Sequence, residues 1–333
     1  MNIMTSNRLC DLNIYKQLYN ELIPFEISDK DLLIIPDGKL FHLNFESLID
    51  GNDQFLILNH KIRYAYSTEI LQIQEALAEQ IQSEEILSLT PGFTSENKAQ
   101  YTSQVDSVLI DSFYLQILQQ PFMLRVADQL RQKNSSLNFT NLDATELNYK
   151  NNNTDVRLIH LGTHGILNDK SPMMSYLIFS KSEQDTLEDG YLHTYEVYNQ
   201  KINAELAVLA ACQTGVSNIE GGESIQSLSH AFTYAGCPSV VMSLWKIDEK
   251  ANAEILNQFY EGLNKRQLKS KSLRDAKLSF IENAPPELKH PYYWSGLVLI
   301  GADKEMTIGQ TVSWYYYLLL LIPFLIFLWY KKR

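Results

Sequence analysis

The sequence predicts an α/β fold built on a mostly parallel sheet with helices on both faces. Short apolar runs, typical of buried strands, alternate along the chain with longer stretches whose apolar residues recur at helical spacing. Two of the apolar runs end in reactive side chains, and parallel sheets place such groups together at the carboxyl ends of their strands. The chain has 333 residues, of which 45% are apolar, so it can fill the core of a large domain.

Each expected strand is an apolar run that ends in glycine, proline or polar turn residues. The runs are Leu32–Ile35, Ile86–Leu89, Arg157–Leu161, Ala207–Ala211, Ser239–Ser243 and Leu297–Ile300. The expected helices are Thr68–Ile81, Gly222–Ala235, Ala251–Leu263 and Ser270–Ile281. The polar stretches Phe93–Asp106 and Asn148–Asp155 predict exposed loops. The second loop divides residues 24–303 into halves, 24–150 and 151–303, after a short helical lead at 1–23.

Charge and cysteine content exclude several classes of protein. The chain has 28 Lys and Arg residues against 39 Asp and Glu residues, so its formal charge is −11 and nucleic acid is not an expected partner. The cysteines, Cys10, Cys212 and Cys237, contain no C-x-x-C pair, which predicts neither disulfides nor a cysteine zinc site. Histidine spacing gives no metal motif and no phosphate-binding glycine pattern is present, so no metal and no other cofactor is expected.

The C-terminus predicts a membrane anchor. Met306–Tyr330 carries no charge, and at about 1.5 Å per residue its apolar core, Val312–Tyr330, is long enough to cross the hydrocarbon layer of a bilayer. Aromatic residues at both ends of this core suit the two membrane interfaces, and a basic tail at 331–333 follows it. Residues 304–311 are then a juxtamembrane linker. The alternative is a buried core helix.

Two arguments about membrane orientation oppose each other. The basic tail favours a cytoplasmic C-terminus with the domain outside, whereas unpaired thiols and an N-terminus without secretory-signal features favour a cytoplasmic domain. We expect the domain in the cytoplasm and the chain to cross the membrane once, because a three-residue tail crosses a bilayer more readily than a folded enzyme.

Two expected strands end in an imidazole and a thiol. Residues 157–161 are followed by Gly-Thr-His164-Gly165, and residues 206–211 are followed by Cys212. If the two strands are parallel neighbours, His164 and Cys212 emerge at the same sheet edge. The imidazole can then remove the thiol proton to give a nucleophilic thiolate. We expect the amides of Gly165 and Cys212 to face the oxyanion of a tetrahedral intermediate.

The segments around these residues resemble those of the CHAT family, caspase-like cysteine peptidases related to caspases and separases. The matching segments are 160–165, 210–215, 221–236 and 240–248 in the C-terminal half, and 33–48 and 64–67 in the N-terminal half. The resemblance covers about residues 24–303 and implies a caspase-like sheet, with His164 and Cys212 as the catalytic pair and Gly165 at an oxyanion-hole position. His160 is expected to be structural and to face a covering helix, and Cys237 is expected to pack in the core.

The resemblance also bears on the substrate. Related peptidases cleave after basic residues by means of acidic side chains in the pocket for the residue before the scissile bond. The candidates here are Asp248, Glu249 and Glu223, whereas Lys246 would oppose a bound cation. The alternative for Asp248 and Glu249 is a helix cap, because acidic side chains suit the first turn of a helix.

The resemblance implies limited proteolysis of a protein or peptide substrate by a cysteine endopeptidase, in bacterial signalling or defence. The apolar C-terminus predicts that this enzyme is anchored in a membrane. One alternative is an inactive membrane-tethered scaffold that mediates protein interactions, and another is a hydrolase of small amides. The retained pair and its glycines favour turnover. Many family members carry helical repeats before the peptidase, whereas about 23 residues precede it here, so we expect activation by an upstream protein or by clustering.

Overall fold

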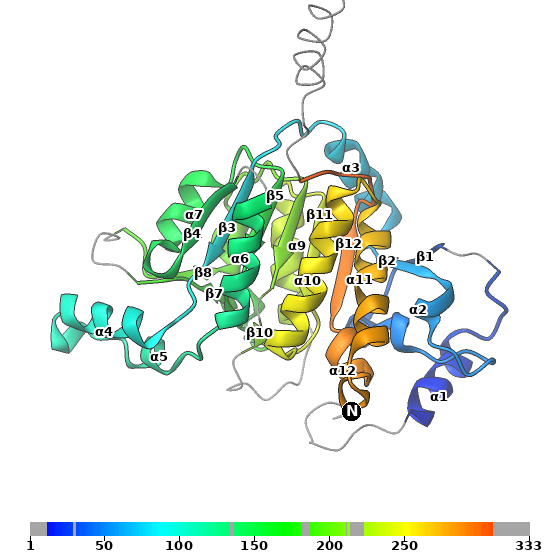
Figure 1. Cartoon of the computed structure of the whole chain (residues 1–333). Helices are drawn as coiled ribbons and strands as arrows, with labels where there is room; N and C mark the ends of the chain where they lie inside the picture. Colours follow the sequence, from blue (N-terminus) through cyan, green and yellow to red (C-terminus); the bar gives the residue numbers. More distant parts are fainter. Residues whose placement is uncertain are drawn as a thin grey trace, which may run out of the picture.

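The main sheet has eight strands, which confirms the predicted α/β architecture (Figure 1). The computed structural model describes residues 12–28, 31–133, 136–181, 187–210, 212–213 and 223–308, without the side chains of 133, 212–213 and 223–226. In spatial order the strands are β1 (Asp31–Ile34), β2 (Lys61–Tyr64), β12 (Leu297–Gly301), β11 (Ser239–Ser243), β9 (Leu206–Leu209), β5 (Leu158–Leu161), β3 (Ile86–Thr90) and β4 (Ser136–Thr140).

Strand direction divides the sheet into two parallel blocks. β11 and β12 are antiparallel, and the other adjacent pairs are parallel. Strands β3, β4, β5, β9 and β11 therefore share one direction, and their carboxyl ends lie at one edge of the sheet. A smaller sheet beside this edge has the order β10 (Cys212–Gln213), β6 (His164–Ile166), β7 (Tyr176–Ile178) and β8 (Tyr191–His193).

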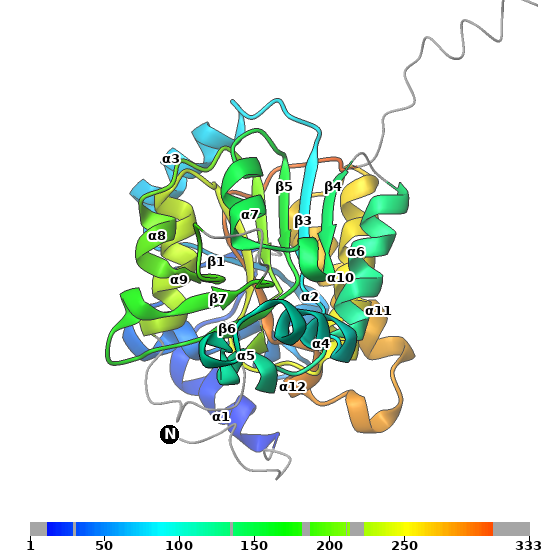
Figure 2. The same cartoon turned by 90° about the vertical axis from the view of Figure 1, so that its left-hand side faces the viewer.

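Helices cover both faces of the main sheet. Figure 2 shows α6 (Pro121–Lys133), α10 (Glu249–Asn264) and α11 (Lys269–Asn283) on one side and α3 (Thr68–Ala78), α8 (Thr194–Tyr198) and α9 (Glu223–Tyr234) on the other. The remaining helices are α1 (Asn13–Leu22), α2 (Leu56–Asn59), α4 (Ser95–Gln104), α5 (Ser112–Gln116), α7 (Glu146–Asn152) and α12 (Pro291–Trp294), with 3-10 turns η1 (Gly38–His42), η2 (Phe45–Ser47), η3 (Ser107–Leu109), η4 (Asn141–Asp143), η5 (Pro172–Met174) and η6 (Pro286–Leu288).

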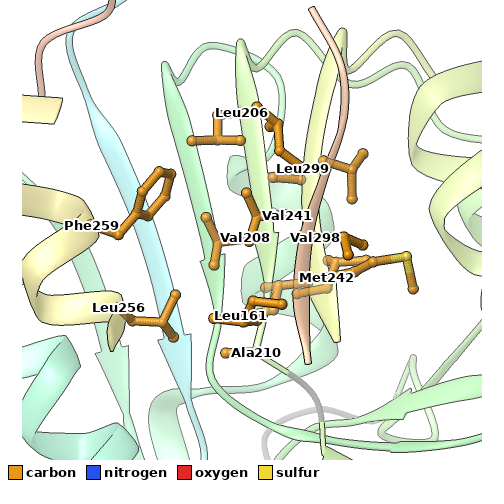
Figure 3. Close-up of a cluster of buried hydrophobic side chains, with 14 of the residues drawn as sticks. Leu161, Leu206, Val208, Ala210, Val241, Met242, Leu256, Phe259, Val298 and Leu299 are labelled. Carbon is orange, nitrogen blue, oxygen red and sulfur yellow. The ribbon is translucent and has the colours of Figure 1, made fainter. Parts of the chain in front are cut away.

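The core explains why the central strands have no polar face. All residues of β3, β5, β9, β11 and β12 are buried, as expected for strands covered on both sides. Leu256 and Phe259 of α10 point toward Leu161 and Val208 of the neighbouring strands (Figure 3). Both α10 residues are fully buried, and each such side chain contributes about 1.5–3 kcal/mol of transfer free energy.

The predicted strands and helices agree with the structure to within a few residues, and helix caps fix several of the boundaries. The Ser67 hydroxyl accepts the Ile70 amide at the start of α3, 3.2 Å away. The Asp248 carboxylate accepts the Ala251 amide at the start of α10, 2.9 Å away. Such caps satisfy backbone N–H groups that have no partner inside the helix.

The prediction of exposed loops at 93–106 and 148–155 was wrong, because both stretches contain helical residues. Phe93–Asp106 contains α4, which Thr94 caps through the Asn97 amide, and Asn148–Asp155 overlaps α7. The two helices are polar in sequence, yet each buries a tyrosine, Tyr101 in α4 and Tyr149 in α7. Single aromatic anchors hold these helices, and a search for a regular apolar stripe does not detect them. Helix α6 and strands β2, β4, β7 and β8 were also not predicted.

The described part of the chain contains no helix that is long and apolar enough to cross a membrane. The predicted span at 312–330 lies outside the described residues. Ile308, the last of them, is buried. The Arg157 guanidinium donates to the Thr307 carbonyl, 3.3 Å away, at the amino end of β5. The chain therefore reaches residue 308 at the sheet edge opposite the carboxyl ends of β5 and β9.

A buried ion pair joins the N-terminal segment to the C-terminal half. The Lys277 ammonium of α11 donates to the Glu46 carboxylate and to the Leu297 carbonyl, and both charged side chains are almost completely buried. The Asn44 side chain also contacts the Glu46 carboxylate, 3.2 Å away. Burial lowers the pKa of Lys277, and the neighbouring Glu46 partly offsets that effect. The pair fixes segment 33–48, which resembles the CHAT family, against α11 and β12.

We predict that Lys277→Met destabilises the protein by about 3–5 kcal/mol, because Glu46 is then a buried charge without its cation. The double variant Glu46→Leu with Lys277→Met should recover most of that loss. The control is Lys16→Met, which removes an exposed ion pair with Asp53 and should cost about 1 kcal/mol or less. The measurement is urea denaturation of the four proteins, and equal losses in the Lys277→Met and Lys16→Met variants would contradict the prediction.

Candidate active site

The backbone places His164 and Cys212 side by side. Strands β6 and β10 are parallel, and in their register Cys212 pairs with His164 and Gln213 with Gly165. Neighbouring strands lie about 4.8 Å apart, and paired positions share a face of the sheet. The preceding strands, β5 and β9, are also parallel neighbours, so the predicted neighbour relation is confirmed. The side chain of Cys212 lies outside the described residues, and the catalytic role of the pair stays a prediction.

The His164 imidazole is buried and held by a backbone carbonyl. Nitrogen Nε2 lies 2.8 Å from the Leu118 oxygen, in the connection between α5 and α6. A carbonyl can only accept, so Nε2 carries the proton and the neutral ring has its lone pair on Nδ1. The proton-accepting nitrogen of His164 is therefore Nδ1. Sequence reasoning missed Leu118, because its contribution comes from the main chain and has no side-chain signature.

An aromatic ring packs beside this imidazole. The Phe93 and His164 ring centroids are 5.5 Å apart, and Phe93 is fully buried. Phe93 has a φ of 51°, a left-handed conformation that costs a non-glycine residue about 1–3 kcal/mol. Gly92 is also left-handed, with a φ of 69°. This turn directly after β3 places the ring against His164, and strain of this kind commonly accumulates at functional sites.

His160 has a different environment and a structural role, as predicted. Its ring is fully buried, and Nδ1 lies 2.8 Å from the Tyr260 hydroxyl of α10, the helix that covers this face. Burial lowers the pKa of His160 to about 4, so the ring is neutral near pH 7.

Gly162 connects the two histidines and has no space for a side chain. A Cβ atom there would lie 2.8 Å from the Thr90 hydroxyl and 2.9 Å from Nε2 of His160. The Gly162 amide donates to the Leu89 carbonyl, 3.0 Å away, which holds the turn close to β3. The glycine therefore lets the chain pass from β5 to β6 at the point where His164 emerges.

The predicted substrate-binding carboxylates lie at helix starts. Asp248 is exposed and caps α10. The Glu249 oxygen Oε1 accepts the amides of Phe122 and Met123, 2.7 and 3.1 Å away, at the start of α6. Burial raises the pKa of Glu249, and these two hydrogen bonds oppose the rise. The helix-cap alternative thus accounts for one oxygen of each residue, and substrate binding stays a prediction. Glu223 begins α9, and its side chain lies outside the described residues.

Gly165 pairs with strands on both sides, with Gln213 of β10 and Leu177 of β7. Binding of an oxyanion by the amides of Gly165 and Cys212 stays a prediction.

Two further polar groups are accounted for by packing and charge. Cys237 is buried in the core, as predicted. Its thiol donates to the Ser239 carbonyl, and burial raises its pKa to about 12, so it is a poor nucleophile. The carboxylates of Glu146, Glu188 and Glu196 lie within 4.8 Å of one another. The Lys150 ammonium lies 2.6–2.8 Å from each of them and occupies the centre of the group. The cluster therefore links α7 to the segments around β8 and α8 as an ion-pair network.

Comparison with known sequences supports the resemblance to one family. The model of the CHAT domain matches residues 12–302. Tetratricopeptide repeat protein 28 from Homo sapiens is 27% identical over 139 residues, which cover 40% of this chain and 6% of that protein. The Mus musculus protein of the same name is 25% identical over 139 residues, with the same coverage. The chain thus spans about 6% of the length of these curated relatives.

Comparison with solved structures concerns the fold. The Saccharomyces cerevisiae separase–securin complex has a TM-score of 0.50 and 13% identity, over 82% of this chain and 15% of the matched chain. The Arg-specific cysteine proteinase gingipain R has a TM-score of 0.49 and 11% identity, over 92% of this chain and 70% of the matched chain. The likeness to separase shows a shared fold, which confirms the caspase-like architecture expected from the resemblance.

We predict that Gly162→Ala destabilises the protein by about 1–3 kcal/mol, because the new methyl group overlaps Thr90 and His160. The matched control is Gly51→Ala, where no atom lies within 4 Å of the added Cβ, and its effect should stay within about 0.5 kcal/mol. The free energy of unfolding from urea titrations distinguishes the two. The prediction is wrong if both variants have the stability of the parent.

Proposed function

The chain belongs to the CHAT family of caspase-like cysteine peptidases, and on that basis we propose that it is an endopeptidase acting through Cys212 and His164. The observation that carries this proposal is the register of β6 and β10, in which the two residues are direct partners. We further propose that it performs limited proteolysis of a protein substrate in bacterial signalling or defence. An inactive CHAT scaffold remains the alternative, and the experiment below separates the two.

The proposed reaction follows from the tautomer of His164. Nδ1 takes the thiol proton of Cys212, and the thiolate attacks the scissile carbonyl carbon. The amides of Gly165 and Cys212 would donate to the resulting oxyanion. The imidazolium then gives its proton to the leaving amine, and water hydrolyses the acyl-enzyme by the reverse proton transfer. The Leu118 carbonyl keeps the ring oriented throughout and favours the imidazolium form, because it accepts from Nε2–H.

The proposed substrate has a basic residue before the scissile bond. The chain's formal charge of −11 favours encounter with basic segments. Asp248, Glu249 and Glu223 are the proposed carboxylates, and the first two keep one oxygen each beyond those that cap helices. Exposed Lys246 would weaken binding of a cation near Asp248.

We also propose that residues 312–330 anchor the protein in a membrane, with the domain in the cytoplasm. The support is the length and apolar composition of that segment. Because residue 308 lies at the amino ends of the central strands, the candidate site would face away from the membrane. A protein substrate or an activating protein could then approach it from the cytoplasm.

The test uses the full chain purified in detergent and a library of peptides. Cys212→Ala and His164→Ala should each lower the cleavage rate by about a thousandfold or more, because the dyad acts as a unit. The matched control is Cys10→Ala, which removes a thiol outside the described residues and should leave cleavage unchanged. Cuts should follow Lys or Arg. Equal cleavage by Cys212→Ala and the parent rejects the nucleophile, and a properly folded parent that cleaves nothing favours the scaffold.

A further inference from the structure

The Leu118 carbonyl that holds His164 lies in a connection without regular structure. Helix α5 ends at Gln116 and α6 begins at Pro121, so no helical hydrogen-bond ladder fixes the carbonyl's direction. The Leu118 side chain is 60% exposed, so packing contributes little to its position. We refer to residues 117–123 as the orienting segment. Its direction must come from contacts made by its other residues.

A lysine holds the first end of the orienting segment. The Lys98 ammonium, from α4, donates to the carbonyl of Ile117, the residue directly before Leu118. Burial lowers the pKa of Lys98, which shows that the ammonium is partly removed from water. A charged donor in such surroundings makes a stronger hydrogen bond than a neutral one. Rotation of the Ile117–Leu118 backbone is therefore restricted from the side of α4.

A glutamate holds the other end. Glu249, the first residue of α10, accepts the amides of Phe122 and Met123 in the first turn of α6. These are backbone donors for which a helix start offers no internal partner. Between the two ends, the Gln120 side chain donates to the Thr163 carbonyl, 3.3 Å away. The orienting segment is thus also tied to the residue before His164.

We propose that Lys98 and Glu249 are positioning residues that clamp the two ends of the orienting segment and thereby hold the Leu118 carbonyl against His164. The inference rests on the proposed Cys212–His164 reaction and assigns Glu249 a role in addition to substrate binding. Without the clamp the carbonyl moves, Nε2–H loses its acceptor, and the imidazolium that pairs with the thiolate is destabilised. The Cys212 thiolate then forms only at higher pH.

The test measures alkylation of Cys212 by iodoacetamide as a function of pH, in the full chain in detergent, with peptide mass spectrometry to identify the modified cysteine. Lys98→Met and Glu249→Leu should move the midpoint of the alkylation profile upward by about one pH unit or more. Each substitution releases the Leu118 carbonyl and so weakens its hydrogen bond with the charged ring of His164. In peptide hydrolysis Lys98→Met, at a residue that is not proposed to bind substrate, should lower kcat more than it changes KM.

Conservative variants separate positioning from loss of fold. Lys98→Arg keeps a charged donor, and Glu249→Gln keeps an oxygen that can accept both amides, so each should keep the alkylation midpoint of the parent. Lys16→Met, which removes a surface ion pair, serves as the control for loss of a lysine. If Lys98→Met or Glu249→Leu fails to fold, the proposal still requires the parent midpoint in the Arg and Gln variants.

The outcomes distinguish failure of the clamp from failure of the proposed function. A parent in which Cys212 reacts like an ordinary thiol, with a midpoint near about 8.5, rejects the dyad itself. A parent with a lowered midpoint that Lys98→Met and Glu249→Leu leave unchanged rejects the clamp alone. A Glu249→Gln midpoint that moves as far as that of Glu249→Leu overturns the assignment of Glu249 as a backbone acceptor.

Discussion

The candidate site depends on a backbone constraint, the in-register pairing of β6 with β10. Strand β6 follows β5 of the main sheet and β10 follows β9, and β5 and β9 are themselves parallel neighbours. A shift of one residue in this pairing would put Cys212 and His164 on opposite faces, since side chains alternate along a strand. Close packing of fully buried strands and the glycine turn at Gly162 oppose such a shift.

Segments that are distant in the sequence orient the side chain of His164 within this backbone arrangement. The imidazole of His164 is oriented by the main chain of the connection between α5 and α6, and that connection is tied to α4 and α10 by Lys98 and Glu249. On the same face of the sheet as α10, the Glu46–Lys277 pair fixes the N-terminal segment to α11. These charged groups are partly or fully buried, so each depends on a specific partner, and each contact joins segments that are distant in the sequence.

The features that could be predicted from the sequence are those that depend on a local pattern of residues. Apolar runs located the central strands. The residues after two of them indicated His164 and Cys212 as candidates for catalysis and distinguished His164 from the structural His160. Polar helices escaped prediction, because α4 and α7 are anchored by single buried tyrosines. The Leu118 carbonyl and the Glu249 cap of α6 could not have been predicted from periodicity, since each contact joins segments whose proximity exists only in the folded chain.

Nitrogen NMR of the His164 ring, in the parent and in Cys212→Ala, tests most directly whether this imidazole is oriented to act as the base for the Cys212 thiol. We expect that in both proteins the neutral form of the ring is protonated at Nε2, and that the titration midpoint of the ring changes when the thiol is removed, because Nδ1 and Cys212 share a proton. A neutral ring protonated at Nδ1, or a titration indifferent to the loss of Cys212, would contradict it.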